Sequence, residues 1–458
     1  MMRQRAALGR GEAMQVPGSI SRCRSDSMGA LLQGGAIMLA KTLRRLIRQG
    51  RLTIIRSNGV TEQFGELTAA EPRPDVAVRL KGALTSLKLA LHPDLYFGEL
   101  YVDSALTIER GTLWDLLELL GRNRLGQRSM PGNSVIGPLQ TFLSWMRQGA
   151  SRRAARRHVA HHYDLPHEHY RRFLDADLQY SCAYFTDPSF SLEQAQEAKK
   201  RHIAAKLLLE PGLRVLDIGC GWGGLALSLA EMERVEVVGV TLSREQLNVA
   251  RKRAKQARLE ERVRFALQDY RAIQGPFDRI VSVGMFEHVG TSHYARFFQK
   301  IRDLLSADGI ALIHSIGRMN GPAVTSAWTR KYIFPGGHIP ALSEVAPIIE
   351  HAGLVLTDLE ILRLHYAETL RHWRERFMRS HQQEGRTSDQ RFCRMWEFYL
   401  ASSELAFRYG GLMVFQAQLA RQLDSVPLRR DYMYQREREE ARIGTPRRLT
   451  SVKREAQA

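Results

Sequence analysis

Residues 214–224 predict a buried strand, a glycine-rich turn and the start of a helix, because they read Arg-Val-Leu-Asp-Ile-Gly-Cys-Gly-Trp-Gly-Gly. Glycine has no Cβ, so the backbone of such a turn can approach a ligand closely. Taken alone, the same pattern also fits a tight turn in an ordinary α/β protein. The segment therefore favours an α/β fold, and the rest of the chain has to show whether the turn binds a ligand.

The segments after this turn continue the pattern of alternating strands and helices. We expect strands at 214–218, 235–240, 262–266, 278–283 and 309–314. Helical stretches separate these strands. Such alternation predicts a parallel sheet with helices on both faces.

The glycine spacing does not match the dinucleotide pattern Gly-x-Gly-x-x-Gly. The next predicted strand ends in Thr241-Leu242-Ser243. An acidic residue usually stands there when a protein binds the ribose of NAD. The sequence thus argues against a dinucleotide cofactor and leaves other nucleotide-like ligands open.

Seven further segments identify the family that the chain resembles. They are Tyr163-Asp-Leu165, Gln179-Tyr-Ser-Cys-Ala-Tyr184, Gly239-Val-Thr-Leu-Ser-Arg-Glu-Gln246, Gln268-Asp-Tyr-Arg271, Phe277-Asp-Arg-Ile-Val-Ser-Val-Gly-Met-Phe-Glu-His-Val-Gly290, His314-Ser-Ile-Gly317 and Lys331-Tyr-Ile-Phe-Pro-Gly-Gly337. In this order, over residues 160–425, they resemble the cyclopropane-fatty-acyl-phospholipid synthases and their mycolic-acid relatives. These are class I S-adenosylmethionine-dependent methyltransferases.

The resemblance implies a fold and an activity. The fold is α/β: a class I methyltransferase, Rossmann-like doubly wound sheet with a helical cover over the acyl site and a small α+β amino-terminal domain. The activity is transfer of a methylene group from S-adenosylmethionine to the cis double bond of unsaturated acyl chains in membrane phospholipids, giving cyclopropane fatty acids. The alternative within the family is a lipid C-methyltransferase that gives a methyl-branched chain without ring closure.

The resemblance also implies which residues bind S-adenosylmethionine. They form four groups: the pair Tyr180 and Ser181, the glycine turn, the segment after the second strand, and the pair Gln268 and Asp269, which would face the adenine. Asp269 would accept a hydrogen bond from the exocyclic amine of the adenine. The set is Tyr180, Ser181, Leu216, Asp217, Gly219, Gly221, Gly223, Gly224, Thr241, Leu242, Ser243, Gln246, Gln268 and Asp269. Taken by itself, Asp269 could instead be a helix or turn cap.

Ring closure needs a base that removes a proton from the transferred methyl group, and in the family this base is thought to be a bound bicarbonate ion. The resemblance carries its ligands to Cys182, Glu287, His314, Ile316 and Tyr366. His314, Tyr366 and the Ile316 amide would donate to the anion, and Glu287 would accept from its hydroxyl. The set favours ring closure over methyl branching. No metal site is expected.

The chain departs from the family pattern at two places. Pro166-His167 stands where the family usually has Gly-Asn, which leaves the local loop conformation open. The region 338–365 also diverges, so that the assignment of Tyr366 rests on its own short motif.

The balance of charge is strongly basic, with 67 Lys and Arg against 48 Asp and Glu, a formal net charge of +19. Such a charge suits a polyanion, either nucleic acid or anionic lipid headgroups. No Asn/Asp-Pro-Pro-Tyr type motif supports a nucleic-acid methyltransferase, so we expect no nucleic-acid partner. A non-catalytic lipid-binding protein is a further alternative, against which intact Cys182, Glu287 and His314 argue.

Cysteine usage and hydropathy point to a location. The four cysteines form no Cys-x-x-Cys pair, which fits a reducing cytoplasm. No apolar run reaches the ~18 residues of a membrane span. We therefore expect a cytoplasmic protein peripherally associated with the inner, anionic face of the membrane, where its partners are unsaturated phospholipid acyl chains. A homodimer is left open.

The chain divides into five expected regions. Residues 1–36 are expected to be disordered or a non-native extension, and 37–120 to form a small domain for lipid docking or dimerisation, or a plain scaffold. Residues 121–160 read as a basic linker, 161–425 as the catalytic domain, and 426–458 as a charged, mobile tail. Within the catalytic domain, the stretch 392–420 looks helical.

Overall fold

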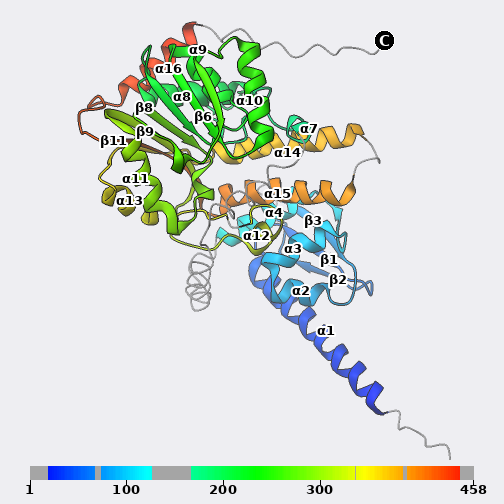
Figure 1. Ribbon diagram of the computed structural model, residues 1–458. Helices are drawn as coiled ribbons and strands as arrows, with labels where there is room; N and C mark the ends of the chain where they lie inside the picture. Colours follow the sequence, from blue (N-terminus) through cyan, green and yellow to red (C-terminus); the bar gives the residue numbers. More distant parts are fainter. Residues whose placement is uncertain (1–18, 68–73, 126–166, 336, 385–388, 444–458) are drawn as a thin grey trace, which may run out of the picture.

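The computed structural model describes residues 19–67, 74–125, 167–335, 337–384 and 389–443. These residues form an amino-terminal part and a larger catalytic part, which meet along the helix α15 (Gln390–Tyr409) (Figure 1). The amino-terminal part ends with α4, before the undescribed stretch 126–166. The predicted linker therefore lies outside the described residues from residue 126 onward.

The amino-terminal part combines one small sheet with four helices, as the expected α+β domain requires. Its elements are α1 (Ser19–Leu46), β1 (Arg51–Ile55), β2 (Thr61–Phe64), β3 (Asp75–Leu80), α2 (Thr85–Leu91), α3 (Pro93–Val102), β4 (Leu106–Arg110) and α4 (Leu113–Leu125). The sheet order is β2-β1-β3-β4. Only the pair β1 and β3 is parallel.

The first helix begins earlier than the sequence suggested. Residues 1–36 were expected to lack structure, but α1 starts at Ser19. Its buried residues Leu39, Ala40 and Leu43 pack against the rest of this part. A helix anchored by these apolar residues can extend by several turns, because each added residue closes one further backbone hydrogen bond. Residues 1–18 lie outside the described chain.

The catalytic part contains one seven-stranded sheet. Its strands are β5 (Arg214–Ile218), β6 (Glu236–Thr241), β7 (Val263–Leu267), β8 (Phe277–Val283), β9 (Leu305–Arg318), β10 (Val355–Ile361) and β11 (Leu412–Ala420). The order is β10-β11-β9-β8-β5-β6-β7, with β11 antiparallel to both neighbours and every other pairing parallel. The five strands expected from the sequence are all present.

Helices cover both faces of this sheet, as the alternation of strands and helices predicts. The helices are α7 (His167–Arg171), α8 (Leu192–Leu207), α9 (Gly224–Glu233), α10 (Arg244–Ala257), α11 (Tyr294–Leu304), α12 (Ala327–Tyr332), α13 (Leu342–His351), α14 (His365–Glu384), α15 and α16 (Asp431–Ile443). One core cluster joins α8, α9 and α10 to the sheet. A second cluster joins α11 and α13 to it.

The predicted helix over 392–420 is wrong in its second half. The helix α15 ends at Tyr409, and β11 follows from Leu412 as a central strand in which every residue is buried. The chain changes direction at Gly411, whose φ of +76° suits glycine. A continuous apolar run does not distinguish a buried strand from a helix by periodicity, which explains the error.

The carboxyl-terminal region was expected to be mobile from residue 426, but α16 packs against α8. The imidazole of His202 on α8 contacts Glu437, and the guanidinium of Arg436 donates to the carbonyl of Leu209 at 2.8 Å. Charged residues dominate α16, which makes it look like a solvated tail in the sequence. Its partners are other charged groups, which the sequence does not pair. Residues 444–458 lie outside the described chain.

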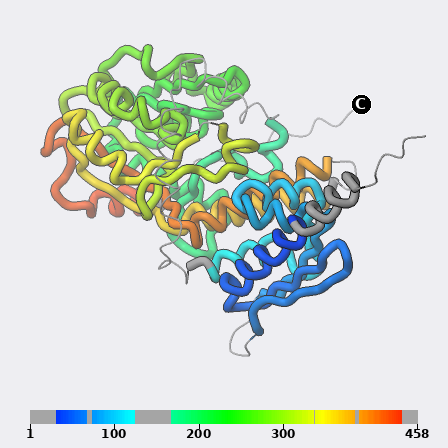
Figure 2. The backbone as a smooth tube through the Cα atoms, turned by 90° about the horizontal axis from the view of Figure 1, so that it is seen from below, coloured from blue at the N-terminus to red at the C-terminus, as the bar shows by residue number. Residues whose placement is uncertain are grey.

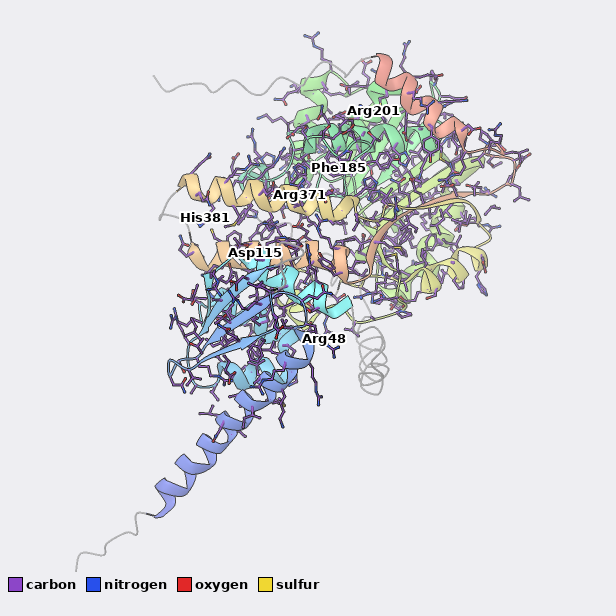
Figure 3. All side chains as sticks on the ribbon, turned by 180° about the vertical axis from the view of Figure 1, so that it is seen from behind. Arg48, Asp115, Phe185, Arg201, Arg371 and His381 are labelled. Atoms are coloured by element: carbon purple, nitrogen blue, oxygen red, sulfur yellow. The ribbon has the colours of Figure 1, made fainter. Side chains whose placement is uncertain are left out.

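The helices α14 and α15 run side by side between the two parts. The helix α15 packs against α14 on one side and against α4 on the other, and Figure 3 labels Arg371 on α14 and Asp115 on α4. Seen from below, the amino-terminal part lies against α15 (Figure 2). Tyr101 donates to Glu397 at 2.6 Å, and Arg394 donates to the Tyr101 carbonyl at 2.7 Å.

Candidate functional site

The order of strands in the large sheet reverses at β5, which has β6 on one side and β8 on the other. Ligands of open α/β sheets bind outside the carboxyl ends of the strands at such a point. A cavity with about 1290 Å³ of empty space, including its part open to solvent, lies there, and residues that follow β5, β6, β7 and β8 line it. This places a ligand site next to the glycine-rich turn.

The glycine turn gives the cavity its floor. Gly221 has a φ of +53°, and a Cβ added to it would meet no atom of the described residues within 4 Å. The position is therefore open toward the cavity, and the backbone there is accessible to a ligand. At Gly224 a Cβ would instead come within 2.5 Å of the Asp177 carboxylate. That glycine allows the segment before α8 to pack against the turn.

Eleven of the fourteen predicted cofactor-binding residues line this one cavity. They are Tyr180, Ser181, Asp217, Gly219, Gly221, Gly224, Thr241, Leu242, Gln246, Gln268 and Asp269. They come from four separate parts of the chain that the fold brings together. Their convergence on one cavity agrees with a shared ligand.

The other three predicted residues have structural positions instead. Leu216 is a fully buried core residue of β5. Gly223 begins α9 with a φ of +82°, and a Cβ there would come within 2.6 Å of Phe265. Ser243 caps α10, because its hydroxyl accepts from the Gln246 amide at 3.3 Å. A family motif contains residues that support the turn as well as residues that face the ligand, and the resemblance alone does not distinguish the two kinds.

Asp217 offers the cavity an unpaired acceptor. Its side chain is 2% exposed, and in the part of the chain that the structure describes Oδ2 has no hydrogen-bond partner. Burial raises the pKa of this carboxyl to about 7, against a smaller lowering effect of Lys199. Leaving a buried acceptor unpaired costs about 1–3 kcal/mol. A ligand that carries a positively charged donor, as S-adenosylmethionine does in its ammonium group, fits this acceptor.

Asp269 forms the helix cap that was the alternative to a cofactor contact. Its carboxylate accepts from the backbone amide of Arg271 at 3.0 Å and caps the short helix η1 (Tyr270–Ala272). The Arg271 guanidinium forms two further bonds with it, at 2.8 and 2.6 Å. Asp269 nevertheless lines the cavity, and each carboxylate oxygen accepts more than one donor. The cap and a ligand contact are therefore compatible.

A buried lysine that the sequence did not single out holds Ser181, one of the predicted cofactor contacts. Lys199 on α8 is 0% exposed, and its ammonium donates to Gln179 Oε1 at 2.6 Å and to Ser181 Oγ at 2.9 Å. Burial lowers the pKa of Lys199 to about 8. In sequence this residue is one of two adjacent lysines in a helix, a pattern typical of a solvated face. Nothing in the sequence alone indicated that it points inward.

The segment before α8 is also fixed by ion pairs. Asp177 pairs with Lys200 at 2.9 Å and contacts Arg253 of α10. The same arginine donates to the Trp222 carbonyl in the glycine turn at 3.0 Å. Where the family usually has Gly-Asn, His167 begins α7, and its amide donates to Glu245 at 3.0 Å. Residues 163–166 of that motif lie outside the described chain.

Glu287 lies beside the cavity, in the short helix η2 (Phe286–His288). His288, Val289 and Met285 line the cavity around it. Glu287 is 8% exposed, and burial raises the pKa of its carboxyl. Its Oε1 accepts from the backbone amide of Ile316 at 2.6 Å, whereas Oε2 has no hydrogen-bond partner among the described residues.

The contact between Glu287 and Ile316 changes one expectation. The amide of Ile316 was predicted to donate to a bound anion, but here it donates to the carboxylate of Glu287. Two of the five predicted anion ligands therefore touch each other directly. The free oxygen of the carboxylate is the part of this pair that remains available to a ligand.

His314 lies two residues before Ile316 on β9, so their side chains share one face of the sheet. The imidazole is 2% exposed, and its Nδ1 faces the Nε2 of Gln416 at 3.1 Å. Burial and the nearby cations Lys199 and Lys206 hold the pKa of His314 well below its ordinary value. The ring is therefore neutral at physiological pH.

Cys182 and Tyr366 belong to the same core cluster, and Tyr366 lies in the first turn of α14. The amide of Ala183, next to Cys182, donates to Thr369 on α14 at 3.0 Å, and Tyr366 lies one turn earlier on the same helix. Cys182 is 1% exposed, and burial raises the pKa of its thiol. Its Sγ donates to the neighbouring Ala183 carbonyl at 3.3 Å. A neutral thiol is a weak donor and not a nucleophile here.

Comparison with known proteins decides the family of the chain. The family model described as mycolic acid cyclopropane synthetase matches residues 150–417, more than half of the chain. The chain belongs to this family. The predicted recognition is thereby confirmed, and so is the fold class. As a member, the protein is an S-adenosylmethionine-dependent methyltransferase.

Curated members of the mycolic acid cyclopropane synthetase family and their relatives differ in product by name. The cyclopropane-fatty-acyl-phospholipid synthase of Escherichia coli is 42% identical over 264 residues, which cover 58% of this chain and 68% of that protein. The tuberculostearic acid methyltransferase UfaA1 of Mycobacterium tuberculosis is 36% identical over 411 residues, covering 86% of this chain and 93% of its own. Its match includes the amino-terminal part.

Solved structures of the family support the fold of the catalytic part. The mycolic acid cyclopropane synthase CmaA1, complexed with SAH and CTAB, superposes with a TM-score of 0.55 at 33% identity, covering 58% of this chain and 97% of that one. The cyclopropane synthase MmaA2 from Mycobacterium tuberculosis gives the same TM-score and identity. Within the described parts of this chain, no helix has the length and hydropathy that a membrane crossing requires.

Proposed function

We propose that the protein transfers a methylene group from S-adenosylmethionine to the cis double bond of unsaturated fatty acyl chains in membrane phospholipids and closes a cyclopropane ring. The name of the Escherichia coli relative supports this substrate class. The observation that carries the proposal is the buried carboxylate of Glu287 beside the cofactor cavity, one oxygen of which pairs with none of the described residues.

The chemistry explains why such a carboxylate is needed. Bound S-adenosylmethionine supplies an electrophilic methyl group, to which the π electrons of the alkene bond while the carbon–sulfur bond breaks. The substrate then carries a positive charge, and a proton must leave the new methyl group so that its C–H electron pair can close the ring. The site must place a base there and exclude water, which would capture the cation.

Different residues of this chain would bind the cofactor and hold the base. The eleven predicted residues that line the cavity would hold the cofactor, with Asp217 facing its ammonium group. Glu287 and His314 would hold a bicarbonate ion that accepts the proton. The free oxygen of Glu287 suits the hydroxyl of bicarbonate, because a carboxylate is an acceptor. Its raised pKa is consistent with a group that waits for a donor.

A second candidate is supported by the match to UfaA1, which extends over 86% of this chain. In this reaction a hydride would shift to the cationic carbon before the proton leaves the new methyl group. The product would carry a C=CH₂ group on the open chain, and a methyl branch would form only after a separate two-electron reduction by a hydride donor. Both candidates use the same cavity and the same base, so that the acyl product separates them.

The test incubates the full chain with S-adenosylmethionine and vesicles of unsaturated phospholipid, followed by mass spectrometry of the acyl chains. Both products gain one CH₂ group. Mild hydrogenation distinguishes them, because an alkene takes up two hydrogens and a cyclopropane does not. We expect a product that resists mild hydrogenation. A product that takes up two hydrogens would support the second candidate, and no gain of CH₂ would contradict both.

We further propose that the protein works as a cytoplasmic, peripheral membrane protein at an anionic lipid surface. The net charge of +19 supports this location. The phospholipid substrate requires access to a bilayer, because its acyl chains lie there.

A further inference from the structure

The partner of His314 is a second buried side chain on the neighbouring strand. Gln416 of β11 pairs directly with His314 of β9 in the register of the sheet. Its side chain is 0% exposed, and Nε2 lies 3.1 Å from the Nδ1 of His314. None of the motifs that identify the family includes this glutamine.

The ammonium of Lys206 decides which way the Gln416 amide points. Lys206 on α8 is 0% exposed and lies 2.8 Å from Gln416 Oε1. An ammonium only donates, so the oxygen of the amide must face it and the NH₂ group must face His314. The NH₂ group only donates as well. The Nδ1 of His314 must therefore accept, and the proton of the neutral ring must be on Nε2.

Lys206 is itself held by a chain of charged groups that reaches α16. It contacts Glu360 of β10, and Glu360 lies 2.7 Å from the Nε2 of His202. The Nδ1 of His202 contacts Glu437 of α16, and the ring of Tyr184 stacks on this imidazole with centroids 4.2 Å apart. Every link is a buried or half-buried pair. This series of contacts therefore holds the ammonium of Lys206 in place.

We propose that Gln416 is a positioning residue for the reaction: oriented by Lys206, it fixes the neutral tautomer of His314 that carries its proton on Nε2, so that His314 donates to the bound bicarbonate. This rests on the proposed function, which assigns the anion to His314. The glutamine does not conduct the proton away, since an amide neither gains nor loses protons in this range. Gln416 instead sets the direction of the hydrogen bonds of His314: Nδ1 accepts from the glutamine, and Nε2 donates to the anion.

The substitution Gln416→Glu tests the tautomer with almost no change in volume. The new carboxylate would keep the pair with Lys206 but accept a hydrogen bond from Nδ1–H of His314. The neutral ring would then lose its proton on Nε2 and with it the bond to the anion. We expect the bicarbonate concentration for half-maximal activity to rise about tenfold or more, the size of one hydrogen bond to a charged group. The affinity for S-adenosylmethionine should not change.

The pH profile gives a signature that a merely structural role would not produce. The charged groups that act on His314 are Lys199, Lys206, His202 and Glu360. A carboxylate at position 416 would raise the pKa of His314. Below that pKa both ring nitrogens carry protons and the donor returns; above it the donor is lost. Activity of Gln416→Glu should therefore fall as the pH rises through this pKa.

Two further variants serve as controls. Gln418→Leu changes an equally buried glutamine on the same strand, whose bonds go to the Lys206 carbonyl at 2.6 Å and the Tyr432 hydroxyl at 2.7 Å. It tests for general damage to β11 and should leave the bicarbonate dependence unchanged. Gln416→Leu leaves Nδ1 without a donor and permits both tautomers, so that its loss should be smaller than that of Gln416→Glu at high pH.

Nitrogen NMR of the histidine-labelled full chain reads the tautomer without any reaction. The signal is assigned by its absence in His314→Asn, since the chain has 15 histidines. We expect the proton on Nε2 in the wild type and on Nδ1 in Gln416→Glu at high pH. A wild-type proton on Nδ1, or equal bicarbonate dependence of Gln416→Glu and wild type, would overturn the inference. Wild-type activity independent of bicarbonate, with the proton still on Nε2, would instead overturn the proposed anion and leave the positioning of the ring standing.

Discussion

At Gly221 a single side chain should decide whether the cofactor binds. A Cβ at this residue points into open space in the cavity, and the φ of +53° is unfavourable for a branched side chain. We expect Gly221→Val to abolish binding of S-adenosylmethionine in calorimetry while the circular dichroism spectrum stays native.

The control for this variant is Gly212→Val. Gly212 has a φ of +86°, and a Cβ there would also meet no atom within 4 Å in the described parts of the chain, but Gly212 is not among the residues that line the cavity. It carries a comparable backbone strain at a distance from the ligand. Undiminished binding by Gly221→Val, or an equal loss in Gly212→Val, would rule out this placement of the site.

Single residues also show how far sequence reasoning reaches. A resemblance transfers residues whose type is required by the ligand, and eleven of them line the cavity. It does not separate them from Leu216, which lies in the core, or Ser243, which caps α10. Lys199 and Gln416 were missed because a lysine in a helix and a glutamine in a strand carry no signal until their neighbours in space are known.

Among the elements, α16 should stabilise the catalytic part through Glu437. This carboxylate contacts His202, whose side chain is 1% exposed. Burial opposes the charge of His202, but hydrogen bonds to Glu360 and Glu437 outweigh it and raise its pKa above the ordinary 6.5. We expect Glu437→Gln to lower the free energy of unfolding by about 1–3 kcal/mol, as the loss of a bond to a buried charged group does.

The pH dependence of this loss follows from the sign of the shift. A raised pKa in the folded state adds stability that is fully present below pH 6.5 and is lost as the pH rises through the folded-state pKa. The difference between wild type and Glu437→Gln in denaturant unfolding should thus be largest at about pH 6 and should shrink above it. Glu439→Gln, in an exposed position on the same helix, should have no such effect. A difference that grows with pH would contradict the assigned pair.

At the scale of elements, the sequence predicted five of the seven strands of the large sheet, because alternating strands and helices have clear boundaries. The strand β11 was taken for helix, since its nine residues are all buried and show no alternation. The helix α16 was taken for a mobile tail, because its contacts are ion pairs and hydrogen bonds to distant residues. In both cases the contacts that decide the structure are long-range.

The molecule as a whole should bind anionic membranes through charge. We expect neutralising four arginines of the predicted linker to weaken binding to vesicles that contain anionic lipid, most strongly at low salt, because salt screens exposed charges. The four are Arg152, Arg153, Arg156 and Arg157. They lie outside the described residues.

A variant with the same change in net charge separates position from total charge. It neutralises four exposed basic residues on and next to α10: Arg244, Lys252, Lys255 and Arg258. Vesicle sedimentation at several ionic strengths compares the two variants. Equal binding by both would show that the arginine run has no specific contact with the membrane.

The central claim is that Glu287 acts, together with bicarbonate, on the proton that leaves the transferred methyl group. The most direct measurement is the conversion of unsaturated phospholipid by wild type and by Glu287→Gln, each with and without bicarbonate, alongside calorimetric binding of S-adenosylmethionine. Glu287→Gln keeps the shape but removes the charge, and a positioned base contributes on the order of 10²-fold or more to the rate. We predict a loss of that size in turnover with nearly unchanged cofactor affinity, and a response to bicarbonate in the wild type that is much smaller in the variant. Full activity of Glu287→Gln in carbonate-free buffer would contradict the account.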